Sequence, residues 1–121
     1  MADHNELGKE GEALAYNLLK KKGYQILDMN WRYGKNELDI IAMDNEYLVV
    51  VEVKTRCNPY FETPKEAVTL RKQKNIIRAA NAYVIENDIE NETRFDIISV
   101  MFWNNKVEIE HIEDAFYPLL R

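Results

Sequence analysis

Two short apolar runs carry charged residues at positions where a strand would be buried. The first is Glu37-Leu38-Asp39-Ile40-Ile41-Ala42, and the second is Leu48-Val49-Val50-Val51-Glu52-Val53-Lys54. Both runs have the composition of strands, and a charge inside a buried strand costs free energy unless a partner compensates it. Three carboxylates and one ammonium grouped in this way predict an active site that binds a metal ion.

Strand periodicity places the charged groups on one side of a predicted hairpin. Alternate residues share a face, so Glu52 and Lys54 point the same way from the second strand. A hairpin closed with Met43 opposite Glu46 makes Asp39 a diagonal neighbour of Glu52 on that face. A slip of two residues sets the two carboxylates directly opposite each other, whereas a slip of one residue turns the whole strand over.

Two carboxylates this close repel each other unless a cation joins them. Oxygen ligands suit Mg²⁺ or Mn²⁺, and Mg²⁺ typically takes one or two carboxylates together with waters and substrate phosphate. Lys54 could hold or activate a water, or stabilise negative charge that develops at phosphorus. The alternative is a buried salt-bridge network in which Lys54 neutralises Glu52 and Asp39, an arrangement that adds little stability in general.

The remaining sequence predicts the elements that hold these residues. A helix is expected from about Asn5 to Lys22, strands over 24–33, 37–42 and 47–55, a long helix from Thr63 to about Glu86, and a last hairpin over 95–112. Thr63 and Glu66 form a capping box, and Asn104-Asn105 suits a tight turn. The third strand is apolar on both faces, so we expect it at the centre of a mixed sheet flanked by helices, an α/β fold.

Composition narrows the class of protein. The 121 residues fit a single domain over residues 1–121, and 46% hydrophobic content argues against disorder. No apolar run approaches the roughly 18–20 residues of a membrane span, so no membrane association is expected. The polar N-terminus is unlike a signal peptide, and one cysteine, Cys57, excludes an internal disulfide. These features predict a cytoplasmic protein.

The charge distribution predicts where a phosphate backbone would bind. The net charge of −5 argues against indiscriminate nucleic-acid binding, but residues 54–78 contain seven basic residues and two acidic ones. The basic residues expected to follow a phosphodiester backbone are Arg56, Arg71, Lys72, Lys74 and Arg78. The alternative is a solvated, basic helix face.

The long helix places one polar residue in its apolar stripe of Leu70, Gln73, Ile77, Ala80 and Val84. The amide of Gln73 could position an attacking water or the scissile phosphate next to Lys54. The alternative is a residue at the rim of the core that bonds to the backbone.

The sequence lacks the residue patterns of other kinds of catalytic site. His4, His111 and Cys57 do not have the spacing of a zinc site. Ser99 lies inside a predicted strand, and no phosphate-binding glycine loop is present.

The pattern Asp39-x12-Glu52-x-Lys54 resembles the signature of the PD-(D/E)xK nuclease superfamily. The segments around it resemble, more narrowly, the YraN-type family of small, mostly uncharacterised endonuclease-like proteins. The matching segments are Asn36-Glu37-Leu38-Asp39-Ile40-Ile41-Ala42, Val51-Glu52-Val53-Lys54-Thr55-Arg56, Gly8-x-x-Gly11-Glu12-x-x-Ala15 and Gly23-Tyr24-x-Ile26-Leu27-x-x-Asn30-x-Arg32. The resemblance covers about residues 7–112. Asn36 replaces the usual glycine and Leu38 the proline of the superfamily's name, and neither change removes a chemical group.

The resemblance implies a restriction-endonuclease-like αβββαβ core. By position, it implies that Asp39 and Glu52 bind metal and that Lys54 is the catalytic lysine. Glu12 matches an acid that archaeal-type Holliday junction resolvases place near the metal, although an ordinary carboxylate at the helix rim fits the same position. The implied activity is that of a Mg²⁺- or Mn²⁺-dependent endonuclease acting on DNA, and branched or junction DNA is expected by analogy with the resolvases.

Three hypotheses therefore stand. The chain is a metal-dependent endonuclease, a nucleic-acid-binding module that keeps the nuclease fold, or a structural domain whose charges form a buried salt bridge. A homodimer would suit an enzyme that cuts both strands, but the residues do not distinguish DNA from RNA. Asp39→Asn separates the first hypothesis from the third, because loss of a metal site leaves the fold intact and loss of a buried ion pair does not.

Overall fold

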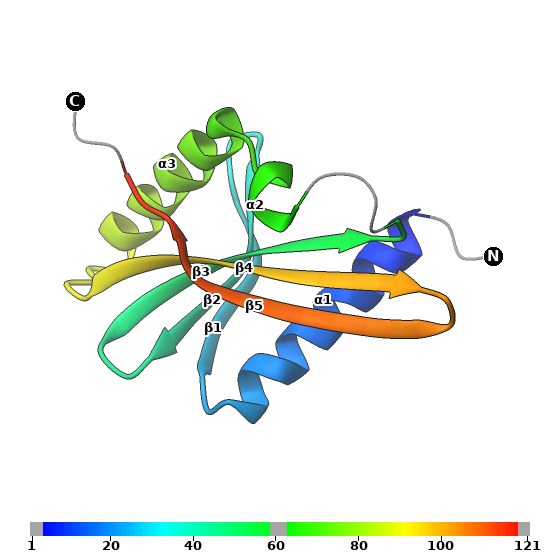
Figure 1. The fold of residues 1–121 in the computed structure, drawn as a ribbon. Helices are drawn as coiled ribbons and strands as arrows, with labels where there is room; N and C mark the ends of the chain where they lie inside the picture. The colour runs from blue at the N-terminus through cyan, green and yellow to red at the C-terminus, as the bar shows by residue number, and fades with distance from the viewer. Residues whose placement is uncertain (1–3, 59–62, 119–121) are drawn as a thin grey trace.

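A computed structural model describes residues 4–58 and 63–118 and shows an α/β fold built on one mixed sheet (Figure 1). Its elements are α1 (His4–Lys21), β1 (Gln25–Tyr33), β2 (Asn36–Asp44), β3 (Tyr47–Arg56), α2 (Pro64–Ala67), α3 (Leu70–Glu86), β4 (Glu92–Trp103) and β5 (Lys106–Phe116). The predicted fold class is confirmed. Within the described residues, none of the helices combines the length and hydropathy needed to cross a bilayer.

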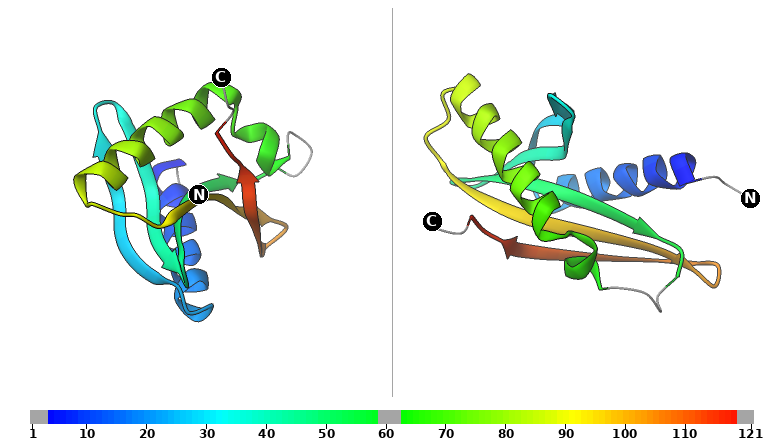
Figure 2. Two further views of the ribbon diagram at one scale, coloured as in Figure 1. Left: turned by 90° about the vertical axis from the view of Figure 1, so that its left-hand side faces the viewer. Right: turned by 90° about the horizontal axis from the view of Figure 1, so that it is seen from above.

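The five strands follow the order β1-β2-β3-β4-β5, and β3 pairs in parallel with β4 while the other neighbours are antiparallel. A parallel pair needs a long crossover, which α2 and α3 supply here. Helix α1 covers one face of the sheet and α3 crosses the other (Figure 2). The central position predicted for β3 is therefore confirmed.

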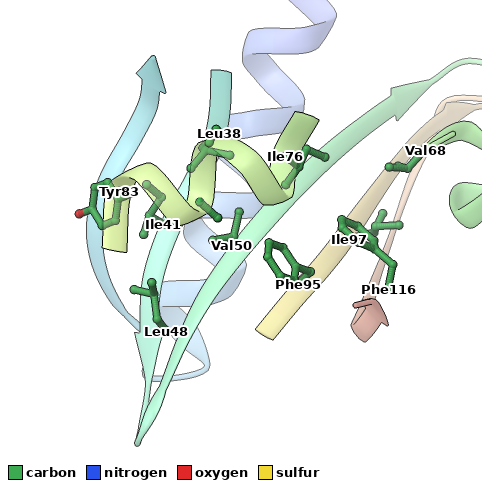
Figure 3. Packing of buried hydrophobic residues seen from close by; sticks show 12 residues of the cluster. Leu38, Ile41, Leu48, Val50, Val68, Ile76, Tyr83, Phe95, Ile97 and Phe116 are labelled. Carbon is green, nitrogen blue, oxygen red and sulfur yellow. The ribbon is translucent and has the colours of Figure 1, made fainter. Parts of the chain in front are cut away.

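Strand β3 is anchored by two apolar cores. On the side of α3, Val50 packs with Ile76 and Tyr83 (Figure 3). On the side of α1, Val49 and Val51 pack with other buried residues of the sheet and the helix. Each of these side chains is 0–4% exposed, and full burial of such a residue is worth about 1.5–3 kcal/mol. The strand is thus rigid up to the point where its charged residues begin.

The turn between β2 and β3 falls one residue later than predicted. Asp44 pairs with Tyr47, so the two turn residues are Asn45 and Glu46, and the closure with Met43 opposite Glu46 is wrong. Asn45 has a φ of 54°, in the left-handed region that asparagine tolerates better than most residues. The conformational preference of Asn45 accounts for the position of the turn.

This shift changes the partner of the first acid. The ladder between β2 and β3 runs to the pair Ile40–Val51, and Asp39 and Glu52 are the next residues on the two strands. The observed register is therefore the two-residue slip, which keeps both carboxylates on one face and brings them closer than the diagonal arrangement.

The predicted helix from Thr63 to Glu86 is wrong in one respect, because it is two helices. The capping box of Thr63 and Glu66 is present and starts α2. Val68 then leaves the helix with φ −101° and ψ 92° and is buried in the core beneath α3. Thr69 starts α3 by accepting a hydrogen bond from the Lys72 backbone at 3.2 Å.

The break also rotates the buried face of α3. Its buried residues are Ile76, Ala79, Ala80 and Tyr83, whereas Leu70 is 63% exposed. The predicted stripe is therefore wrong at Leu70, because the new N-cap sets where the helix begins relative to the sheet.

The last hairpin turns as predicted. Asn104 and Asn105 both have positive φ, 53° and 60°, which matches a type I′ turn between Trp103 and Lys106.

Asp96 is a fully buried charge that ties β4 to β5. Its carboxylate accepts hydrogen bonds from Arg94 at 2.9 Å, from the Asp114 backbone at 3.0 Å and from His111 Nε2 at 2.8 Å. The ammonium of Lys22 lies 2.7 Å from His111 Nδ1, so Nδ1 accepts and Nε2 carries the proton. Burial alone would raise the pKa of Asp96, but the hydrogen bonds from His111 and Arg94 outweigh it and lower the pKa.

Asp96→Asn should destabilise the protein by about 3–5 kcal/mol, because it leaves Arg94 buried without its main counter-charge. Urea unfolding measures this loss. The matched control is Asp88→Asn, an exposed residue at a φ of 51° that asparagine accepts, and it should stay within about 0.5 kcal/mol. The wild type should also lose stability as pH falls through the lowered pKa of Asp96, a loss absent from the variant. Equal stability of both variants would contradict this role.

Candidate active site

Asp39 lies where β2 and β3 stop pairing. Its carboxylate Oδ2 accepts a hydrogen bond from the Val53 backbone N–H at 2.8 Å. A backbone donor beyond the end of the ladder is thus satisfied by a side chain instead of by a neighbouring strand. The bond fixes the carboxylate beside the end of β3, next to Glu52.

A kink in β1 explains why the strands separate here. Asn30, between the paired residues Met29 and Trp31, has a φ of 53°. Met29 packs into the core beneath α1, whereas Trp31 packs into the core beneath α3. Alternation would keep residues two apart on one face, so the sheet face changes at Asn30 and at Asp39 opposite it. The end of the β1–β2 hairpin therefore turns away from β3 and leaves the carboxylate accessible from a cleft.

Glu52 is 5% exposed and receives its counter-charge from α3. Lys72 Nζ lies 3.1 Å from Glu52 Oε2. Burial alone would lower the pKa of Lys72, but the negative charge of Glu52 outweighs burial and raises the pKa. Lys54, by contrast, lines the same cleft and forms no ion pair with any residue of 4–58 or 63–118.

The two neighbouring carboxyl groups make the ionised form of Asp39 unfavourable in the absence of a cation. Burial and the adjacent charge of Glu52 raise the pKa of Asp39 to about 8, and the Val53 hydrogen bond offsets only part of this. Glu52 lies close enough that a hydrogen bond to its carboxylate would also favour the protonated form of Asp39. Burial also raises the pKa of Glu12, although Asn30 hydrogen-bonds its carboxylate.

A cleft of about 630 Å³ brings these residues together. Glu12 from α1, Asp39 from β2, Glu52 and Lys54 from β3, and Lys72 from α3 line it. Gly11 lets α1 approach this end of β3, because a Cβ there would collide with Thr55 Oγ1. A Cβ at Gly8, one turn earlier on the same helix, would meet no atom within 4 Å.

The donor set fits a hard divalent cation. Asp39 and Glu52 supply adjacent oxygen ligands, and Glu12 faces them from the other side of the cleft. Over 4–58 and 63–118, no three acidic, histidine or cysteine side chains are grouped closely enough to hold a metal by themselves. One or two carboxylates with waters and phosphate are what Mg²⁺ typically requires, whereas a closed zinc site needs four protein ligands.

The predicted phosphate-binding residues divide into three groups. Arg56 and Lys72 line the cleft, and Arg56 also donates to Ser99 Oγ at 3.1 Å. Arg78 lines a second groove between α3 and β1. Arg71 and Lys74 are exposed on α3 and are not among the residues that line the cleft.

Gln73 bonds to the backbone at the rim of the core, which was the alternative to a role in the cleft. Its amide donates to the Val68 carbonyl at 3.0 Å, and it does not line the cleft. The amide thereby satisfies a backbone acceptor at the break between α2 and α3.

Comparison with known proteins places the chain in a family. Residues 11–100 match the model of the uncharacterised protein family UPF0102. The chain belongs to this family. A UPF0102 protein of Bacteroides thetaiotaomicron is 52% identical over 120 residues, which cover 99% of each chain. A UPF0102 protein of Flavobacterium psychrophilum is 50% identical over 117 residues, covering 97% of this chain and 98% of the relative. The YraN-type resemblance is therefore confirmed.

Two features of this UPF0102 site were missed from the sequence. Lys72 was expected to contact phosphate, and its contact with Glu52 depends on the helix break at Val68, which the capping pattern did not reveal. The kink at Asn30 was also missed, although an asparagine inside a strand pattern was a usable signal for a positive φ.

Lys72→Met should destabilise the metal-free UPF0102 protein by about 1–2 kcal/mol, less than for a fully buried pair because Lys72 is half exposed. Urea unfolding in the presence of a chelator measures this change. Lys74→Met is the matched control, since Lys74 is exposed two residues away, and it should be nearly neutral. Equal losses in the two variants would show that the Glu52 contact carries no stability.

The raised pKa of Asp39 predicts an unusual pH dependence. Between the unfolded value of 3.8 and the folded value of about 8, the folded state holds a proton that the unfolded state has released. The contribution of Asp39 to the free energy of unfolding of the metal-free protein therefore falls as the pH rises from about 5 to about 8. Asp39→Asn should lose less stability over that interval in chelator, as measured by urea midpoints. The same decline in both proteins would contradict the raised pKa of Asp39.

Proposed function

We propose that this UPF0102 protein is a divalent-metal-dependent endonuclease that hydrolyses phosphodiesters in DNA. The observation that carries the proposal is the contact between the Asp39 and Glu52 carboxyl groups in a cleft that Lys54 also lines. Two acids held this close are unfavourable as a structural device, because each destabilises the charged form of the other. A divalent cation resolves that conflict.

Asp39 and Glu52 would hold Mg²⁺ or Mn²⁺, and Glu12 would face the ion from α1. When bound, such an ion lowers the pKa of water and neutralises charge on a phosphate. The Val53 N–H keeps the Asp39 carboxylate oriented toward the cleft. The protein thereby supplies a fixed ligand geometry before substrate arrives.

The cations of the cleft complete the catalytic set. Lys54 lines the same cleft, where its ammonium could donate a hydrogen bond to the attacking water or to a phosphate oxygen. Arg56 also lines the cleft, and it would contact a neighbouring phosphate of the strand. Lys72, which contacts Glu52 in the metal-free protein, would be available to contact a phosphate if a cation neutralised Glu52 instead.

The substrate and setting follow as parts of the proposal. The net negative charge of the protein disfavours binding to duplex DNA of any kind, and the cations near the cleft favour binding to a particular DNA structure. Branched or junction DNA is the class expected by analogy with resolvases. A homodimer would place two such clefts on two strands. The expected compartment is the cytoplasm.

One observation favours an alternative function. Lys72 already neutralises Glu52, which suits a nucleic-acid-binding module that keeps the fold without turnover. The two functions differ in what a divalent cation does, so a cleavage assay separates them.

Asp39→Asn should abolish Mn²⁺ binding and lower the rate of cleavage by more than about 100-fold, beyond the loss typical of outer-shell partners of a metal. Branched DNA with Mg²⁺ or Mn²⁺ is the substrate, and calorimetry with Mn²⁺ reports binding on the same samples. Asp88→Asn, an exposed acid in the turn before β4, is the control and should retain both properties.

The outcomes separate the hypotheses. Cleavage and metal binding that vanish together only in Asp39→Asn support the metallonuclease. DNA binding that is the same with and without a divalent cation, and no cleavage in the wild type, would instead support the binding module.

A further inference from the structure

A pair of aromatic rings lies at the end of β1, with Trp31 half-buried and Tyr33 exposed. Trp31 and Tyr33 share a face of the strand, and their rings are parallel within 2° at a centroid separation of 6.4 Å. Tyr33 is 44% exposed, so its outer side is accessible to a ligand. Parallel aromatic rings with one open side can accept a further flat ring by stacking.

The rings are held in place from below. Trp31 meets Tyr83 of α3 edge to face, with centroids 5.0 Å apart and planes at 86°. Tyr83 is buried, and its hydroxyl donates to Asp28 at 2.7 Å. Because Trp31 cannot turn without disturbing this core contact, its ring has a fixed orientation beside Tyr33.

The rings form one wall of a groove of about 480 Å³ between β1 and α3. The other wall includes Arg78, Ala82 and Ile85, and Ile85 is 67% exposed. Arg32 and Arg78 are the cations of the groove and Glu86 is its acid, while Arg32 also lies 3.4 Å from Glu37. An open groove that combines aromatic rings with arginine side chains matches an aromatic ligand that carries negative charge.

The groove lies along the same helix as the candidate active site. A hollow of about 260 Å³ lies between them and is lined by Asp39, Lys72 and Asn75, of which the first two also line the cleft. Lys72, Asn75, Arg78 and Ala82 follow one face of α3. At about 1.5 Å per residue, Lys72 and Ala82 are about 15 Å apart, the length of roughly four stacked nucleotides.

We propose that the Trp31–Tyr33 groove binds an unpaired nucleobase of the strand whose phosphodiester occupies the cleft. This inference rests on the proposed nuclease function and adds a substrate class to it. Stacking on aromatic side chains is tolerant of sequence, since every base has a π face. In an intact duplex the bases are already stacked and paired, so the site selects a strand with unpaired bases, as in a flap, gap or open junction.

Tryptophan fluorescence tests the groove directly. The chain contains two tryptophans, so Trp103→Phe leaves Trp31 as the sole reporter. The probe is an oligothymidylate of about ten nucleotides, long enough to reach from the cleft to the groove. Titration in chelator prevents cleavage. We expect quenching of Trp31 by the single strand and at least about five-fold weaker binding of a blunt duplex of the same length.

Variants of Tyr33 identify stacking as the cause. Tyr33→Ala and Tyr33→Leu should each weaken binding of the oligothymidylate by roughly 5- to 100-fold, and Tyr33→Phe should retain it. Leucine keeps the apolar bulk and removes the ring, so weaker binding by Tyr33→Leu excludes a simple apolar contact as the cause. Tyr117→Ala is the matched control, because Tyr117 is 68% exposed and lines a different hollow with Tyr47 and Arg94. Circular dichroism verifies that each variant is folded.

The inference is overturned if the single strand does not quench Trp31, if duplex binds equally well, or if Tyr33→Leu binds like the wild type. An oligouridylate of the same length shows whether the strand is DNA or RNA, and stacking of either supports the groove. Quenching with no cleavage of any DNA would retain the groove and reject the nuclease, whereas cleavage unaffected by Tyr33→Leu would do the reverse.

Discussion

Two carboxyl groups in contact at the end of a buried strand are the constraint around which this molecule is arranged. Asp39 and Glu52 would repel each other in the low dielectric of the protein if both were ionised. In the metal-free protein this repulsion raises the pKa of Asp39, and the ammonium of Lys72 and the N–H of Val53 offset part of it. These groups supply positive charge or a hydrogen-bond donor in the position where a divalent cation would neutralise both carboxylates.

The fold creates this contact by ending a strand pair early. Two apolar cores fix β3 up to Val51, and the kink at Asn30 turns the β1–β2 hairpin away just beyond that point. Helix α1 closes the cleft from one side because Gly11 allows it to touch Thr55. The break at Val68 starts α3 where Lys72 can reach Glu52. The same divergence leaves Trp31 half-buried and Tyr33 exposed next to α3, so the cleft and the aromatic groove have a common origin.

The sequence predicted the elements and the acids because both depend on local rules. Alternation along the strands put Asp39 and Glu52 on one face, and the paired asparagines at 104 and 105 located the last turn. Register and the helix break were predicted incorrectly, because they depend on which competing local preference wins in the packed molecule. Asn45 moved a turn by one residue, and burial of Val68 interrupted a helix that propensity alone would continue.

Long-range partners were the part that the sequence did not reveal. Lys72 is twenty residues from Glu52, and nothing in the helical pattern singles it out from Arg71 or Lys74. Asp96 was a clearer omission, because an acid inside the apolar run Phe95-Asp96-Ile97-Ile98 raises the same question as Asp39 and Glu52. Its ion pair with Arg94 and its hydrogen bond from His111 give it a structural role, whereas Asp39 has another acid as its neighbour.

The most direct test of the carboxyl pair is the number of protons released when Mn²⁺ binds. Calorimetric titration near pH 7 in two buffers of different ionisation enthalpy gives this number from the difference in observed heat. Because the pKa of Asp39 is about 8, we expect release of about one proton per ion in the wild type. Binding with heat independent of the buffer, or no binding at all, would contradict the account of Asp39 and Glu52 as a protonated metal site.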